Sequence, residues 1–362
     1  MKSVYIHIPF CSNICSYCDF TKIYYNKKYI NKYLDSLEKE INKYYNNEIV
    51  KTIYIGGGTP TSLDIDELNK LFKIIKVFKL DENVEFTIEC NIENLTIEKL
   101  DLFKKNNVNR ISIGIQTFNF KYLKLLNRNH NLKDVKKIIN YAKKINFTNI
   151  NIDLMYGFNG QTIKELDEDL NLFLSLNINH ISTYSLMIEP HTKLYIENYK
   201  NIDEEMDYQM YEYICKKLKE NDFIHYEVSN FAKKGYESLH NLTYWNNLEY
   251  YGFGLGASGF INKVRYTNTS NMNKYLLGNY IKEKEVITKK LDMEYEMILG
   301  LRKLKGVNIL DFTKKFNIDL VKYFNIEKLI EENKLIIKDN YIYINPKYIY
   351  IENEFLISFI GE

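Results

Sequence analysis

The chain has 362 residues, of which 45% are apolar and 27% are charged, a composition typical of a soluble globular protein. Its formal net charge of +2 gives no electrostatic reason to expect binding to nucleic acid or to an anionic membrane. We find no membrane span and no signal-peptide core, and three of the five cysteines fall between positions 11 and 18, so we expect a reduced, cytoplasmic protein without disulfides.

Strand-like runs alternate with helical patterns over the first two thirds of the chain. The runs are rich in β-branched and aromatic residues and are followed by Gly or polar residues, as in buried parallel strands. They cover residues 4–8, 52–57, 85–90, 110–116, 151–157 and 180–188. Helical patterns follow them at residues 27–45, 67–78, 99–106, 134–145, 163–176 and 204–219. This order predicts an α/β fold, a partial (β/α)6 barrel in place of a closed eight-fold one.

The last third reads differently. Residues 225–270 look irregular and contain the sequences HNLTYWNN and GFGLGASG. From about residue 288 we expect two or three helices and a β-hairpin turning at Asp339 and Asn340, which together form a small helical domain with a β-wing. The predicted organisation is therefore a barrel over 1–235, a connecting segment over 236–287 and a winged-helix-like domain over 288–362.

Nearly every predicted barrel strand ends in a polar group or a glycine loop. The carboxyl ends of parallel strands meet at one edge of a sheet, where functional groups collect. The groups in question are His7, the cysteines, the run Gly56–Thr61, Glu89, Gln116, Asp153, Tyr184 and Ser185. This layout predicts a cofactor site along that edge.

The cysteine spacing is the sharpest of these signals. Cys11, Cys15 and Cys18 supply three thiolates from one short loop, and thiolates are the ligands of iron–sulfur clusters. Three ligands leave one iron of a 4Fe–4S cube open. The alternative is a structural zinc ion, with His7 as the nearest candidate for a fourth ligand.

The glycine run that follows the second strand also has two interpretations. Adjacent glycines allow close backbone approach to a ligand, and their N–H groups can bind a carboxylate. The run could otherwise be a tight turn before a helix capped by Asp64. Cys90 and Cys215 stand alone in the sequence, and we expect them to be buried thiols.

Together these residues resemble the radical S-adenosylmethionine superfamily, whose signature is CxxxCxxC. The sequences YIHIPFC, CSYCDF, GGGTPT, ISIGIQTF, NRNH, NIDLMYG and ISTYSL are closer still to the oxygen-independent coproporphyrinogen III oxidase family. The resemblance covers nearly the whole chain. It implies that the open iron binds the amino and carboxylate groups of S-adenosylmethionine, and that electron transfer cleaves it to methionine and a deoxyadenosyl radical.

The resemblance also assigns residues. It implies that Cys11, Cys15 and Cys18 hold the cluster, that Tyr5 and Tyr17 flank the cofactor, and that Gly57, Gly58 and Thr59 meet its methionine part. Four further positions contact S-adenosylmethionine in the oxidase, in part a second molecule of it: Glu89, Gln116, Arg128 and Asp153. Simpler interpretations are a surface carboxylate for Glu89, a pair with a helix carboxylate for Arg128 and a helix cap for Asp153.

Two departures favour a different branch of that family, the heme chaperones. The oxidase pattern has a fourth cysteine where this chain has Phe20, and an N-terminal extension where this chain begins its motif at Tyr5. The sequence His240–Trp245 also resembles the HNxxYW motif of the chaperone branch, whose His is implicated in heme binding. Imidazole is a common axial ligand of heme, and Tyr244 and Trp245 could stack on a porphyrin. The alternative is a packed aromatic turn between two domains.

We therefore expect a heme chaperone that carries a 4Fe–4S cluster and S-adenosylmethionine and delivers heme to an acceptor protein, such as a membrane-bound respiratory enzyme. An electron donor is needed if S-adenosylmethionine is cleaved, and whether the chain is an enzyme stays open. The first alternative is an oxygen-independent coproporphyrinogen III dehydrogenase. The second is a radical enzyme that acts on another substrate, and the near-neutral charge disfavours nucleic acid.

Overall fold

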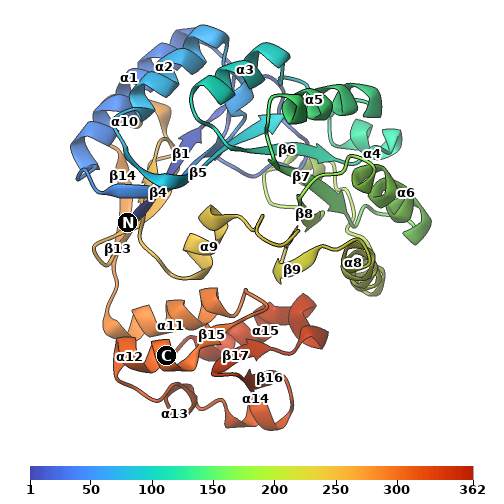
Figure 1. Cartoon of the computed structure of the whole chain (residues 1–362), viewed down its shortest axis with the longest axis vertical. Coiled ribbons are helices and arrows are strands. Elements are labelled where there is room, and N and C mark those ends of the chain that lie inside the picture. Colours follow the sequence, from blue (N-terminus) through green and yellow to red (C-terminus); the bar gives the residue numbers. More distant parts are fainter. Residues whose placement is uncertain (362) are drawn as a thin grey trace.

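The computed structural model describes residues 1–361 and has the predicted α/β architecture. Six parallel strands lie side by side in chain order, β1-β4-β5-β6-β7-β8, and form the curved sheet of Figure 1. The predicted partial barrel is thus confirmed. Their bounds are Lys2–Ile8, Ile49–Gly57, Lys79–Asn91, Arg110–Gln116, Asn149–Tyr156 and His180–Ser185. A two-stranded ribbon, β2 (Phe10–Cys11) with β3 (Ile23–Tyr24), frames the cysteine loop.

Helices follow each of these strands and cover the outer face of the sheet (Figure 1). Capping residues in the local sequence fix where some of these helices begin. Asp64 with Glu67, and Thr162 with Glu165, form complete capping boxes at α2 and α6. The barrel helices are α1 (Lys27–Tyr44), α2 (Ile65–Ile75), α3 (Ile97–Lys105), α4 (Phe120–Leu125), α5 (Leu132–Lys144), α6 (Ile163–Leu174), α7 (Lys193–Ile196) and α8 (Glu204–Lys219), with a 3-10 turn η1 (Pro60–Ser62).

The segment that looked irregular extends the sheet at both edges. β11 pairs with β1 in parallel, and β12, β13 and β14 continue outward in antiparallel order, so the complete sheet has 12 strands. At the other edge β10 pairs with β8, and β9 lies outside it. The bounds are β9 (Ile224–Glu227), β10 (Asn230–Ala232), α9 (Leu239–Trp245), β11 (Tyr250–Phe253), β12 (Ser258–Ile261), β13 (Val264–Asn268), α10 (Met272–Leu276) and β14 (Ile281–Val286).

The C-terminal part carries helices and the three-stranded sheet β15-β17-β16, and lies beside α9 and α8 in Figure 1. Asp339 and Asn340 both adopt positive φ between β16 and β17, which is the turn that their sequence predicted. The bounds are α11 (Lys289–Gly300), β15 (Val307–Asn308), α12 (Ile309–Phe316), α13 (Leu320–Phe324), α14 (Glu327–Glu331), β16 (Leu335–Lys338), β17 (Tyr341–Ile344), η2 (Pro346–Ile351), α15 (Glu352–Leu356) and η3 (Ile357–Phe359).

Side-chain contacts join the C-terminal part to the barrel. Tyr350 donates a hydrogen bond of 2.8 Å to Asp207 of α8, and the other oxygen of Asp207 accepts one of 2.6 Å from Ser185 at the end of β8. Within the C-terminal part itself, Arg302 pairs with the buried Glu352 at 2.6 Å. Within residues 1–361, none of the helices is long and apolar enough to cross a membrane.

Candidate functional site

A cavity of about 430 Å³ opens at the carboxyl ends of the six parallel strands. It lies where the strand endings predicted a cofactor site. Most of the predicted site residues line it together: Cys11, Cys15, Tyr17, Cys18, Gly57, Gly58, Thr59, Glu89, Gln116, Arg128 and Asp153. The β4, β5, β6, β7 and β8 ends and the cysteine loop, which follows β1, thus face one space. Tyr5 and His240 lie outside it.

All three loop cysteines are free thiols that face this cavity. Thr59 donates to the Cys11 sulfur at 3.4 Å, and the Arg128 guanidinium donates to the Cys15 sulfur at 3.7 Å. Burial raises the pKa of Cys18 to about 11, and the nearby Lys22 opposes that shift. Three thiols without a disulfide, with donors aimed at two of them, match the thiolate set that an iron–sulfur cluster needs.

The zinc alternative finds less support in the same loop. Nε2 of His7 lies 2.7 Å from the Thr21 carbonyl oxygen and Nδ1 lies 3.0 Å from the Tyr5 hydroxyl, so both ring nitrogens already have partners. Burial lowers the pKa of His7 to about 4. In this structure His7 shapes the loop.

The glycine run packs directly against the cysteine loop. A Cβ on Gly57, whose φ is 113°, would come within 2.6 Å of the His7 ring. A Cβ on Gly58 would come within 2.8 Å of the Pro9 backbone and 3.0 Å of the Cys11 sulfur. Only glycine fits this approach. Asp64 does cap the next helix, so the run is a helix entry as well as a wall of the cavity.

Two carboxyl groups face the cavity from neighbouring strands. Glu89 accepts from the Tyr54 hydroxyl at 2.8 Å and from the Gly57 N–H at 3.1 Å, so it is no isolated surface carboxylate. Asp153 lies within β7, where it accepts from Asn151 at 2.8 Å and caps no helix. Burial raises the pKa of Glu89 to about 7 and that of Asp153 to about 6, and mutual repulsion adds to the shift of Glu89.

Gln116 combines backbone strain with an unpaired acceptor. Its φ of 74° puts a non-glycine residue in the left-handed region, a conformation that costs about 1–3 kcal/mol and gathers at functional sites. Its side-chain oxygen is buried and has no partner among the described residues. The next residue, Thr117, is held by the buried Asp169 at 2.5 Å, which fixes the end of β6. Gln116 thus lines the cavity with an acceptor that no described residue satisfies, and its role in binding the cofactor stays a prediction.

His240 occupies a closed environment in α9. Its Nδ1 lies 2.7 Å from the Thr52 hydroxyl, its Nε2 lies 2.7 Å from the Tyr244 hydroxyl, and its ring stacks on Tyr54 with centroids 5.0 Å apart. The side chain is 1% exposed. Burial, with help from the charge of Arg110, lowers the pKa of His240 to about 3. Its segment is a short helix with both imidazole nitrogens engaged, and its assignment to heme stays a prediction.

A second cavity, of about 320 Å³, lies beside α9. Aromatic side chains and one guanidinium line much of it: Tyr5, Tyr244, Trp245, Tyr250 and Arg265. Tyr244 therefore stands between this cavity and His240. Tyr5, predicted to flank the cofactor of the cysteine cavity, lines this one instead and bonds His7 through its hydroxyl.

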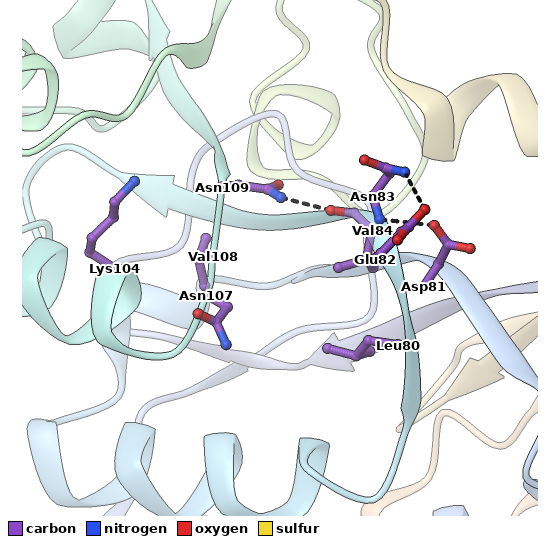
Figure 2. Close-up of a pocket in the computed structure, with 9 residues that line it drawn as sticks. All are labelled: Leu80, Asp81, Glu82, Asn83, Val84, Lys104, Asn107, Val108 and Asn109. Carbon is purple, nitrogen blue, oxygen red and sulfur yellow. Dashed lines mark hydrogen bonds between the residues drawn. The ribbon is translucent and has the colours of Figure 1, made fainter.

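A larger hollow, of about 700 Å³, lies at the opposite end of β5 (Figure 2). Its polar side chains serve the local backbone. Asn109 donates to the Val84 carbonyl at 2.7 Å, and Asp81 accepts from the Asn83 N–H at 2.9 Å. It has no cysteine or histidine in its lining, so size alone does not make it the candidate site.

Several cavity residues were not predicted as site residues. Ser112 lies two residues before Gly114 on the inward face of β6, and the strand period of two applied back from Gln116 would have found it. Lys22 and Met187 also line the cavity, as do Tyr184 and Ser185, which were expected at this edge from the end of their strand. Lys22 and Met187 come from loops, for which no periodic signal exists.

Comparison with known proteins identifies relatives along the chain. The Radical SAM superfamily model matches residues 5–173, and the HemN C-terminal domain model matches residues 287–348. The heme chaperone HemW of Bacillus subtilis (strain 168) is 42% identical, over 93% of both chains, and that of Lactococcus lactis subsp. lactis (strain IL1403) is 41% identical, over 92% of this chain and 90% of the relative. The structure of coproporphyrinogen III oxidase (HemN) from Escherichia coli superimposes with a TM-score of 0.88, at 22% identity, over 99% of this chain and 89% of that one, which shows a shared fold.

Proposed function

The chain belongs to the HemW family of the radical SAM superfamily, and we propose on that basis that it is a heme chaperone, which binds heme and transfers it to an acceptor protein. The observation that carries the proposal is the 42% identity over 93% of both chains with a relative named heme chaperone. The proposal includes a cytoplasmic location and an acceptor such as a membrane-bound respiratory enzyme.

The cysteine cavity would hold the family's cofactors. Cys11, Cys15 and Cys18 would ligate a 4Fe–4S cluster, and the glycine run would meet the methionine part of S-adenosylmethionine. When bound, the cluster supplies an electron able to cleave S-adenosylmethionine, if a donor protein reduces it. The chain's own groups would do the binding: Arg128 offers charge to a carboxylate, the Gln116 oxygen accepts, and Glu89 and Asp153 face the cavity from the sheet.

Heme would bind at the α9 segment. The cavity beside it offers aromatic faces for a porphyrin and the guanidinium of Arg265, which has no ion pair among the described residues, for a propionate. His240 would be the axial ligand. Because its Nε2 is now bonded to the Tyr244 hydroxyl, ligation requires Tyr244 to move away first.

An anaerobic heme titration of the cluster-reconstituted chain, followed by Soret absorbance, tests this proposal. We expect saturation near one heme per chain and at least tenfold weaker binding by His240→Ala, which removes the axial ligand. Tyr244→Phe keeps the ring and frees Nε2, so it should bind heme at least as tightly as wild type. His191→Ala, at an exposed histidine, is the matched control and should not differ from wild type.

The two variants of the motif make the result decisive. Equal binding by His240→Ala and wild type would refute the axial-ligand assignment, and weaker binding by Tyr244→Phe would refute the opening step. Absence of saturable binding in wild type would overturn the chaperone function. Coproporphyrinogen III turnover would then be the next assay, although Phe20 stands where the oxidase has its fourth cysteine.

A further inference from the structure

Glu93 lies just beyond β5, against Arg128, which lines the cysteine cavity, and it was not among the predicted site residues. One of its oxygens meets three consecutive residues: the Arg128 Nε at 3.3 Å, the Asn129 N–H at 3.0 Å and the His130 Nδ1 at 3.3 Å. Its side chain is 24% exposed. Burial alone would raise the pKa of Glu93, but the bond to His130 and the charge of Arg128 lower it to about 2, so the carboxylate is ionised at neutral pH.

The other two branches of the Arg128 guanidinium point inward. Nη2 donates to the Gly114 carbonyl of β6, and Nη1 donates to the Cys15 sulfur at 3.7 Å. The residue is 8% exposed. The guanidinium is therefore fixed from three sides, and Glu93 supplies the only ion pair that it makes within the described residues. Without this carboxylate, the charge beside Cys15 would be held by one carbonyl and one sulfur.

The turn that carries Arg128 also holds the cysteine loop. The Ser16 N–H donates to the Leu126 carbonyl at 3.2 Å, and the Asn127 side chain donates to the Ile14 carbonyl at 3.0 Å. Asn127 itself adopts a φ of 59°, so this turn has little conformational freedom. Through its ion pair with Arg128 and its hydrogen bonds with Asn129 and His130, Glu93 anchors the far side of the same turn.

We propose that Glu93 is a positioning residue, which holds Arg128 against Cys15 and so orients its charge toward a carboxylate-bearing cofactor in the cavity. This inference rests on the proposed function, because it assumes that the cavity binds the cluster and S-adenosylmethionine. Its contribution is to affinity for the cofactor, since a fixed guanidinium loses less freedom when a carboxylate binds.

The experiment compares Glu93→Gln and Glu93→Ala with wild type, as full-length, cluster-reconstituted chains under anaerobic conditions. Calorimetry gives the dissociation constant for S-adenosylmethionine, iron analysis gives cluster content, and thermal melting of the unreconstituted chain reports folding. We expect Glu93→Gln to weaken binding about fivefold and Glu93→Ala more, with iron content and melting temperature close to wild type. Glu98→Gln, at an exposed carboxylate in the first turn of α3, is the matched control and should leave all three unchanged.

Each outcome bears on the inference. Binding by both Glu93 variants within twofold of wild type would overturn it. Weaker binding that comes with lost iron or a lower melting temperature would also overturn it, because Glu93 would then support the fold and not the cofactor. A wild-type chain that takes up no cluster or S-adenosylmethionine would refute the proposed function itself, a failure visible before any variant is compared.

Discussion

The cysteine cavity and the α9 segment handle their polar groups in opposite ways. In the cavity, an amide oxygen of Gln116 has no protein partner, and two carboxyl groups face open space. In α9, both nitrogens of His240 are bonded and its ring is stacked. Motifs predict a site in both regions, but the first has an open cavity with an unpaired acceptor and the second has an imidazole whose two nitrogens are both bonded. Under the proposed function, heme ligation by His240 would therefore begin with a movement of Tyr244.

The largest contrast between the two regions should appear when a cavity thiol is removed. We expect Cys15→Ala to lose nearly all of the about four irons that a reconstituted chain takes up, since two remaining thiolates hold the cluster poorly. Its unfolding free energy should change by less than about 1 kcal/mol, because Cys15 is only partly buried. Iron analysis and urea denaturation measure the two effects.

Cys90→Ala is the matched control for that experiment. Cys90 is buried in β5, where it belongs to the apolar core and also borders the cavity, but it is not in the cysteine loop. The variant should keep its iron and lose about 1 kcal/mol of stability. Iron loss in Cys90→Ala, or retention in Cys15→Ala, would contradict the assignment of the cluster loop.

His240→Ala should show the reverse pattern. The substitution leaves the Thr52 and Tyr244 hydroxyls without their buried partner and opens a space under Tyr54, so we expect a loss of about 2–4 kcal/mol in the unfolding free energy. Iron uptake should stay near wild type. Urea denaturation of the apo chain measures this loss, and a loss below about 1 kcal/mol would mean that α9 is open in solution.

Glu89 makes the unfolding free energy of the chain depend on pH. Its pKa in the folded chain is raised to about 7, mainly by burial, so at pH between about 4.5 and 7 the folded chain holds a proton that the unfolded chain has released. This carboxyl group therefore lowers stability as pH rises through that window. We expect Glu89→Gln to gain about 1–2 kcal/mol at pH 7.5 and almost nothing at pH 4.5, since the cavity is partly open to water. Denaturation at both pH values measures the difference, and an equal gain at both would contradict the raised pKa.

The smallest effect should come from the cap of α9. The Ser238 hydroxyl accepts from the Asn241 N–H at 3.3 Å, and Ser238→Ala should cost about 1 kcal/mol. Because loss of the cap loosens the segment that encloses His240, heme affinity should rise slightly and S-adenosylmethionine affinity should stay constant. Weaker heme binding in this variant would show that α9 must stay folded to bind heme.

The parts of the fold that sequence predicted well are those with periodic signals. Long apolar runs identified the six parallel strands, Asp64 marked the start of a helix, and the pair Asp339–Asn340 marked the hairpin turn. Strands β11 to β14 were missed because they are short and pair with distant segments: β11 joins β1 across some 250 residues of chain. No local sequence pattern in residues 250–286 indicates that β11 pairs with β1.

The site residues also divide into those that the sequence predicted and those that it missed. Residues at strand ends, such as Glu89 and Asp153, were predicted because topology brings strand ends together. Glu93 was not, because its role depends on a turn 35 residues further along the chain that folds back to meet it. The closure of His240 was equally hidden, since Thr52 belongs to a strand that precedes it by 188 residues.

The bond between Tyr244 and His240 has a consequence for how cargo would leave. If opening this bond and the neighbouring packing costs about 2 kcal/mol, only about one molecule in thirty is open without cargo, and the apparent affinity falls by that factor. A heme carrier would benefit from this cost, because the free energy recovered when the Tyr244–His240 bond forms again favours release of heme. The α9 segment would be held in its higher-energy, open conformation while heme is bound, and it would return to its closed conformation on delivery.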